Sequence, residues 1–176
     1  KGMGSEFCNQ NAYDCIQIHG GSGFMKDYAC ERIYRDARIT SIYEGTTQLQ
    51  VVAAIRHVTT GTYSKFIQEL DAAEYAECLK PLQAKLQSMT AVYEAAVAKV
   101  ADAKDTAYTD FMARRMVEMA GHIVMGYLLL DDATRSEGFA KSASNYVRFG
   151  EAEVARHAEF INKFNAESIA DYTYAE

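Results

Sequence analysis

The stretch that decides the fold is Thr106 to Thr134, TAYTDFMARRMVEMAGHIVMGYLLLDDAT. It contains no proline, and its large apolar residues recur every three or four positions, which is the spacing of one face of an α-helix. Such a Met-rich and aromatic stripe is typical of core packing, so we assign it no chemistry. The stripe consists of Phe111, Met112, Met116, Met119, Ile123 and Tyr127.

Two further amphipathic stretches flank this one, from Pro81 to Ala103 and from Phe139 to Phe164. The apolar side of the first, which we expect to face the core, consists of Leu82, Leu86, Met89, Val92, Tyr93, Ala96 and Val100. The connections between the stretches are short and polar, which indicates antiparallel neighbours and hence an up-down helical bundle. A shorter helical segment, Tyr63 to Leu70, precedes them. The only proline, Pro81, is compatible with a helix if it lies in the first turn, where its missing N–H has no intrahelical partner. We therefore predict an all-α chain.

The first 60 residues show a different sequence pattern, with shorter helical segments. We expect helices from Ser5 to His19, from Tyr28 to Arg38, and from Thr46 or Thr47 to Val58, with a glycine-rich turn after the first of them. The helix after Thr46 carries apolar residues at Leu49, Val52, Ala53 and Ile55. The chain is accordingly divided into residues 1–60 and an additional helical module, residues 61–176.

Composition excludes several classes of function. The formal net charge is −6, all of it carried by residues 61–176, which argues against a nucleic-acid surface and against an anionic membrane. The longest apolar run, Ile123 to Leu130, is too short to cross a bilayer. The four cysteines and four histidines show no metal-ligand spacing, so no metal site is predicted. Reduced thiols and no signal peptide favour a cytoplasmic location.

The segment from Gln17 to Gln50 departs from ordinary bundle sequence, QIHGGSGFMKDYACERIYRDARITSIYEGTTQLQ. Read from its residues alone, it is either a salt-bridged surface helix with a capped turn or a functional segment. Three blocks within it, QIHGGSGF at 17–24, ERIYRDA at 31–37 and IYEGT at 42–46, resemble in order and spacing the signature of the FAD-dependent acyl-CoA dehydrogenase family. The resemblance is strong over residues 1–60. Residues 61–176 resemble the extra C-terminal helical module of the larger members.

This resemblance implies a catalytic base. The family removes the α-proton of an acyl-CoA thioester while a hydride leaves Cβ for FAD, and Glu44 matches the position of the base. A carboxylate suits this task in a water-poor pocket, where desolvation raises its pKa. Gly45, which has no side chain, matches a position that contacts the substrate.

The resemblance also implies cofactor contacts. Thr46, Thr47 and Gln48 match contacts to the FAD of the same active site. Gln17, Ile18, His19, Gly20 and Gly21 match a block that reaches the FAD of a neighbouring subunit. Arg32, Arg35 and Asp36 are interpreted as structural residues that brace the loop carrying Glu44.

The chain departs from the family at Ser22, where an aromatic is common, and at Ala29-Cys30. The family's N-terminal helical domain and middle β-domain are not in this sequence. We therefore expect a fragment that is inactive alone and binds little or no FAD. The parent is expected to take an acyl-CoA substrate, to pass electrons to an electron-transfer flavoprotein or similar acceptor, and to be a homo-oligomer.

Two questions stay open at this stage. Residues 61–176 could cap the catalytic part or bind a partner protein, whereas membrane binding is disfavoured by their acidic balance. The competing hypothesis for the whole chain is a non-enzymatic helical protein-interaction module.

Overall fold

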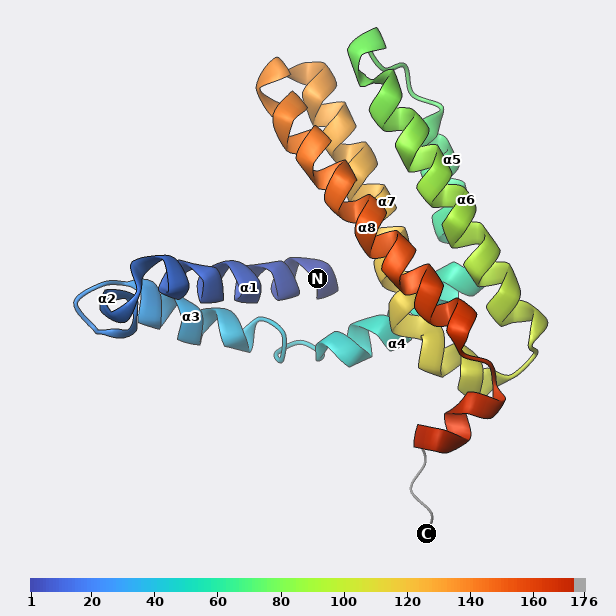
Figure 1. The fold of residues 1–176 in the computed structure, drawn as a ribbon, viewed down its shortest axis with the longest axis horizontal. Coiled ribbons are helices and arrows are strands. Elements are labelled where there is room, and N and C mark those ends of the chain that lie inside the picture. Colours follow the sequence, from blue (N-terminus) through green and yellow to red (C-terminus); the bar gives the residue numbers. More distant parts are fainter. Residues whose placement is uncertain (173–176) are drawn as a thin grey trace. The chain divides into compact units, whose positions relative to one another are not determined.

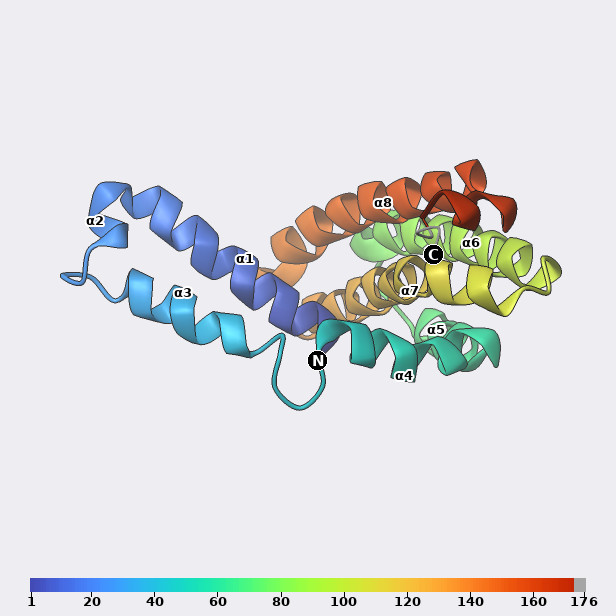
Figure 2. The same cartoon turned by 90° about the horizontal axis from the view of Figure 1, so that it is seen from below.

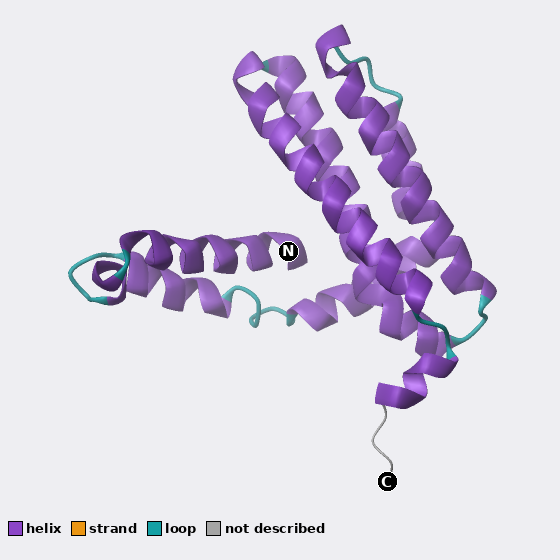
Figure 3. Ribbon diagram, in the orientation of Figure 1, coloured by secondary structure: helices purple, strands orange, loops and turns teal. Residues whose placement is uncertain are grey.

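The computed structural model describes residues 1–172, and within them every regular element is helical (Figure 1 and Figure 3). The prediction of an all-α chain is confirmed. The α-helices are α1 (Gly2–His19), α2 (Gly21–Phe24), α3 (Cys30–Ile39), α4 (Thr47–Thr59), α5 (Thr62–Asp71), α6 (Lys80–Asp102), α7 (Thr106–Arg135) and α8 (Ala140–Lys163). Short 3-10 helices are η1 (Glu77–Leu79), η2 (Glu137–Phe139) and η3 (Glu167–Tyr172).

The chain forms two compact units, Lys1–Ala53 and Ala54–Glu176. The first, called the N-terminal unit below, contains α1, α2, α3 and the first half of α4. The second, called the bundle unit, contains the rest of α4 and all later helices. No helix in the described part of the chain is long and apolar enough to span a lipid bilayer.

The bundle unit is built on α7, which packs against α5, α6 and α8. Figure 2 shows α6, α7 and α8 running side by side. The predicted stripe of α7 forms the centre of the core, since Met112, Met119, Ile123 and Tyr127 have no exposed surface. Burying large apolar side chains of this kind is the main source of stability in such a bundle, at about 1.5–3 kcal/mol each.

Close approach of α6 and α7 depends on Gly126. A β-carbon built at this position would lie 2.5 Å from Cδ2 of Leu86, a side chain of α6 that is itself fully buried. The two helices therefore touch through a site where one of them carries no side chain. This contact fixes how deeply Leu86 enters the core.

Asp71, the last residue of α5, ties that helix to two others. Its carboxylate accepts hydrogen bonds from Tyr127 Oη at 2.9 Å and from the side-chain amides of Gln83 and Gln87 at 2.9–3.1 Å. Hydrogen bonds to a carboxylate are stronger than those between neutral groups. One acid thus joins α5, α6 and α7.

A second polar group lies between α7 and α8. Glu118 accepts a hydrogen bond from Arg114 at 2.8 Å and lies 3.0 Å from Nε2 of the buried His157. Burial works to raise the pKa of Glu118, but the hydrogen bonds from His157 and Arg114 outweigh it and lower that pKa to about 2. The carboxylate is therefore charged at every ordinary pH.

The predicted helices agree with the structure to within three residues at each end, and Pro81 lies in the first turn of α6 as expected. Two details were wrong. Residues 21–24 form one turn of helix, α2, rather than a plain turn. Val92, predicted to lie in the core, is 41% exposed, because Tyr93 occupies the centre of the buried face and its chain neighbour points about 100° away.

Candidate functional site

The N-terminal unit is a helical hairpin followed by the start of α4. Helices α1 and α3 run side by side in both ribbon views and are joined through α2 (Figure 1 and Figure 2). Small residues, including Ala12 of α1 and Ala37 of α3, are buried where the helices meet. A loop, residues 40–46, then leads into α4 and carries Glu44.

Polar side chains of α1 hold this loop at both ends. Ser5 Oγ donates to the carbonyl oxygen of Thr40 at 2.9 Å, and Asn9 Nδ2 donates to that of Ala37 at 3.1 Å. At the far end, Thr47 Oγ1 donates to the Glu6 carboxylate at 2.6 Å. The loop is therefore positioned in part by a neighbouring helix.

At the tip of the loop the backbone takes two successive left-handed conformations. Glu44 has φ 51° and Gly45 has φ 92°, a combination that a side chain at position 45 would strain. Gln50 Nε2 donates to the carbonyl oxygen of Glu44 at 3.1 Å, and a β-carbon at position 45 would lie 2.9 Å from that same nitrogen. Lys1 Nζ donates to the carbonyl oxygens of Tyr43 and Gly45. Non-glycine residues with positive φ cluster at functional sites. In the described residues these are Glu44 and Lys104, and of the two only Glu44 is followed by a glycine.

The Glu44 side chain is exposed, and so are its neighbours Ile42, Tyr43 and Leu49. In this chain the carboxylate is thus open to water, and the water-poor pocket expected for a base is not provided by the described residues. The surface beside the carboxylate therefore includes three exposed apolar side chains, those of Ile42, Tyr43 and Leu49.

Arg32, Arg35 and Asp36 were expected to brace the loop that carries Glu44, and among the described residues they do not contact it through ion pairs. All three are exposed on α3, and none forms an ion pair within residues 1–172. In this chain Ser5, Glu6 and Asn9 of α1 hold the loop instead. Sequence reasoning missed these residues because short polar side chains on a helix carry no distinctive pattern.

The glycine block lies at the opposite end of α1. Gln17, Ile18, His19, Gly20 and Gly21 are all exposed, Ile18 to 83%. Gly20, with φ 60°, ends α1, and a β-carbon at Gly20 or Gly21 would meet nothing within 4 Å. Gly23 is the tight position of the turn, since a β-carbon there would lie 2.7 Å from Cβ of His19. The backbone of this turn is therefore open to a ligand on its outer side.

The three FAD contacts predicted at the start of α4 differ in the hydrogen-bonding groups that they leave for a cofactor. Thr46 Oγ1 accepts from Leu49 N–H at 3.3 Å and so begins α4, while Gln48 is exposed within its first turn, where amide N–H groups lack intrahelical partners. Thr47 donates its hydroxyl proton to Glu6, which leaves only oxygen lone pairs for a cofactor. The open glycine backbone fits the phosphate and polar atoms of a dinucleotide. At the start of α4, the N–H groups of Thr47 and Leu49 already have partners, the carbonyl oxygen of Ser41 at 3.2 Å and Thr46 Oγ1 at 3.3 Å.

The two groups of candidate residues lie far apart. Ser5 anchors the Glu44 loop near one end of α1 and Gly20 closes the other end. At a rise of 1.5 Å per residue, the 14 steps from Ser5 to His19 span about 21 Å. The structure therefore brings Glu44 to Gln48 together, and Gln17 to Gly21 together, but does not join the two groups into one pocket.

A third group, which sequence spacing did not indicate, is formed by Cys15, His19 and Cys30. Cys15 Sγ donates to Cys30 Sγ at 3.4 Å, and His19 Nδ1 lies 3.9 Å from Cys15 Sγ. The hydrogen bond between the two thiols, together with burial, raises the pKa of the Cys30 thiol. Cysteines 15 residues apart could be paired only once the direction of the turn was known.

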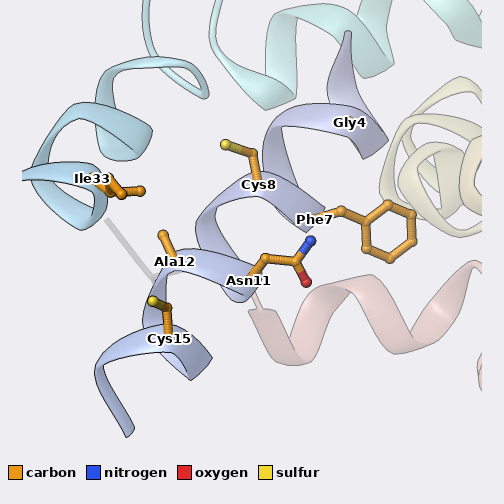
Figure 4. Close-up of a pocket in the computed structure, with 7 residues that line it drawn as sticks. All are labelled: Gly4, Phe7, Cys8, Asn11, Ala12, Cys15 and Ile33. Atoms are coloured by element: carbon orange, nitrogen blue, oxygen red, sulfur yellow. The ribbon is translucent and has the colours of Figure 1, made fainter. Parts of the chain in front are cut away.

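A shallow, mostly apolar hollow runs along the same side of α1. Figure 4 shows Cys8, Ala12 and Cys15 pointing from successive turns of α1 toward the side where Ile33 of α3 lies. It holds no acid, base or cation. The hollow is lined by Gly4, Phe7, Cys8, Asn11, Ala12, Cys15 and Ile33.

Comparisons with known proteins match this architecture over nearly the whole chain. The family model "Acyl-CoA dehydrogenase, C-terminal domain" matches residues 1–59, and "Acyl-CoA dehydrogenase C terminal" matches residues 59–169. The second alone covers more than half of the chain. This chain belongs to the acyl-CoA dehydrogenase family. The resemblance found in its three sequence blocks is thereby confirmed.

Solved structures of the family agree. The crystal structure of an acyl-CoA dehydrogenase family protein from Porphyromonas gingivalis is 41% identical, with a TM-score of 0.62, and the match covers 64% of this chain and 98% of that one. An acyl-CoA dehydrogenase from Bacillus anthracis, complexed with FAD, shares the fold with a TM-score of 0.67 at 21% identity, over 96% of this chain and 33% of that one.

Curated relatives match a shorter region. Caffeyl-CoA reductase-Etf complex subunit CarC of Acetobacterium woodii is 54% identical over 46 residues, 26% of this chain and 12% of that protein. Acryloyl-CoA reductase (NADH) of Anaerotignum propionicum is 48% identical over 62 residues, 31% of this chain and 16% of that protein. An acyl-CoA dehydrogenase of Bacillus subtilis is 44% identical over 62 residues, 35% of this chain and 16% of that protein. This acyl-CoA dehydrogenase family chain thus spans about one seventh of its curated relatives.

Proposed function

We propose that this chain acts as the C-terminal part of a flavoprotein oxidoreductase that α,β-dehydrogenates acyl-CoA thioesters to 2-enoyl-CoA, with Glu44 as the base. The observation that carries the proposal is the Glu44 loop. In this loop an acid and the glycine that follows it both have positive φ, and side chains of α1 anchor the loop at both ends.

In the proposed reaction the Glu44 carboxylate removes the α-proton of the thioester and holds it. The electron pair left at Cα forms the double bond to Cβ as a hydride leaves Cβ. Bound FAD supplies the acceptor for that hydride. Gly45, with no side chain, lets the thioester approach the backbone beside the base. In the reverse direction, the protonated Glu44 returns the proton to Cα, which fits the relatives named as reductases.

The cofactor contacts are proposed in two sets. Thr46, Thr47 and Gln48 hold polar atoms of the FAD that serves Glu44, at the start of α4. Gln17, Ile18, His19, Gly20 and Gly21 contact the FAD of a neighbouring subunit. A separation of about 21 Å along α1 supports this division, because the two sets cannot line one small pocket. Under this proposal the parent is a homo-oligomer.

Water exclusion around Glu44 is assigned to other parts of the full-length protein. Two thirds of the exposed large apolar side chains in the described residues belong to the N-terminal unit, which holds less than a third of the chain. Exposed apolar surface on this scale marks an interface. We infer that the isolated chain is inactive and does not retain FAD, and that the parent passes electrons to an electron-transfer flavoprotein or similar acceptor.

The test uses the full-length flavoprotein that contains this chain. Replacing Glu44→Gln removes the base at almost constant volume, so acyl-CoA oxidation should fall by about 10²–10⁴-fold while the flavin spectrum is unchanged. Glu69→Gln, an exposed acid on α5, is the matched control and should retain full activity. Normal turnover by the Glu44→Gln protein would refute the assignment.

The competing function is a helical protein-interaction module without catalysis. Its support is that Glu44 is exposed and that the turn at Gly20 and Gly21 faces open space. Under this alternative the Glu44→Gln substitution leaves acyl-CoA oxidation unchanged, so the same experiment separates the two functions. Residues 61–176 are proposed to cap the catalytic part, and capture of an acceptor by the bundle unit alone would instead favour a partner-binding role.

A further inference from the structure

We propose that Cys15, His19 and Cys30 form a binding site for one thiophilic metal ion, with Zn²⁺ as the representative ligand. The site shares His19 with the proposed contact to the FAD of a neighbouring subunit, but none of its contacts involves Glu44 or the start of α4. It uses three side chains that the fold brings together from two helices and that leave the glycines of the turn free.

The positions of the three residues follow from the fold. Cys15 and His19 are four residues apart and so lie on one face of α1, while Cys30 is the first residue of α3. The turn through Gly20 and Gly23 reverses the chain and returns Cys30 to Cys15. As a result, one ligand atom from each of the three side chains lies within 4.8 Å of the other two.

Two of the three distances between ligand atoms lie within about 0.4 Å of those expected around one tetrahedral ion. With Zn–S about 2.3 Å and Zn–N about 2.0–2.1 Å, two bound sulfurs lie about 3.8 Å apart and a sulfur and a nitrogen about 3.6 Å apart. In the structure Cys15 Sγ and Cys30 Sγ are 3.4 Å apart, and Cys15 Sγ and His19 Nδ1 are 3.9 Å apart. Shifts of a few tenths of an ångström would bring these two distances to the tetrahedral values, and the third pair, Cys30 Sγ and the His19 nitrogen, lies within 4.8 Å.

The donor types select the ion. Two thiolates and one imidazole favour Zn²⁺ and other soft or borderline ions over Ca²⁺ and Mg²⁺, which require oxygen ligands. No carboxylate within the described residues belongs to this ligand group. Three protein ligands leave a fourth position for water or an external ligand.

Access and orientation also suit the site. Cys30 is buried, Cys15 is half-buried and His19 is exposed, so the group opens to solvent on the histidine side. The rings of His19 and Tyr28 lie 5.8 Å apart at a tilt of 55°, which limits the orientations of the imidazole. A path for entry and an oriented ligand are both required of a metal site.

Binding requires one rearrangement. Without metal, His19 Nδ1 lies 2.9 Å from the carbonyl oxygen of Cys15 and donates to it. On binding, this hydrogen bond is given up, the imidazole proton moves to Nε2, and Nδ1 offers its lone pair to the ion. The two thiol protons are released to solvent, so that the complex contains two thiolates and one neutral imidazole.

The test is a titration of the untagged 176-residue chain with Zn²⁺ against a chromophoric chelator, under a phosphine reductant, and with Co²⁺ as a spectroscopic probe. We expect one equivalent to bind and the Co²⁺ complex to show thiolate charge-transfer absorption. Loss of a residue that only supports a metal ligand costs about 10–100-fold in affinity, so Cys15→Ser, Cys30→Ser and His19→Gln should each weaken binding by at least about tenfold. Circular dichroism checks that each variant folds.

Cys8→Ser and Cys78→Ser are matched controls at exposed cysteines and should bind as the wild type does. A second measurement requires no variant: Zn²⁺ should protect Cys15 and Cys30, but not Cys8 or Cys78, from alkylation as read by mass spectrometry. Absence of a one-to-one complex, unchanged affinity in His19→Gln, or equal protection of all four thiols would overturn the proposal.

Discussion

Replacing Gly126 with alanine tests how α6 and α7 pack. The new β-carbon would lie 2.5 Å from Leu86 Cδ2, more than 1 Å closer than the 3.5–4.0 Å of an ordinary carbon contact. Leu86 is fully buried and cannot move its methyl group into solvent. Overpacking of this kind costs about 1–3 kcal/mol. The better helix propensity of alanine returns about 1 kcal/mol. We therefore expect Gly126→Ala to lower the free energy of unfolding by up to about 2 kcal/mol.

The assay is urea unfolding of the 176-residue chain followed by far-ultraviolet circular dichroism. Gly138→Ala is the control in the same unit, because its β-carbon would meet only Ser136 Oγ at an ordinary 3.6 Å. A double-mutant cycle with Leu86→Ala sharpens the result, since the added methyl fills space that the truncated leucine leaves. The two changes should be less destabilising together than the sum of their separate effects, by about 1 kcal/mol or more. A stabilising Gly126→Ala, or strict additivity with Leu86→Ala, would show that the helices do not touch here.

Two further predictions concern polar groups of the bundle unit. The folded pKa of Glu118 is about 2, below its ordinary value of 4.5, so its carboxylate stabilises the fold above pH 4.5 and this contribution is lost as the pH falls toward 2. In urea titrations, the difference in unfolding free energy between the wild type and Glu118→Gln should therefore narrow between pH 4.5 and pH 3. A difference that stays constant over this range would contradict the assignment. Tyr127→Phe removes the hydrogen bond to Asp71 and should cost about 1.5–3 kcal/mol; an unchanged urea midpoint would mean that this bond contributes nothing.

Much of the fold could be predicted from the sequence because the helices are long and strongly periodic. The stripe from Phe111 to Tyr127 specifies both helix and buried face, and nearly all of it is in the core. Val92 shows the limit: an apolar residue at the edge of a stripe can lie on either side of the boundary between core and solvent. Neighbouring side chains decide its exposure, and periodicity does not contain that information.

The candidate site was only partly predictable, for a different reason. The motif residues around Glu44 follow one another in sequence and were found together in space. The groups that hold them, Ser5 and Asn9, lie about 30 to 40 positions earlier and act through hydrogen bonds that depend on how α1 and α3 pack. The contact between Cys15 and Cys30 likewise could not be predicted from the sequence, since it exists only after the hairpin has formed.

Three of the bonds that fix the Glu44 loop end on main-chain oxygens, those of Ala37, Thr40 and Glu44 itself. Every amino acid supplies such an oxygen, so these hydrogen bonds do not depend on the identity of the side chain that the loop presents. A related chain could therefore exchange the displayed acid for another residue, and with it the chemistry, while retaining the same support. Conversely, loss of Ser5 or Asn9 would change the position and orientation of the side chain that the loop presents, but not its chemical identity.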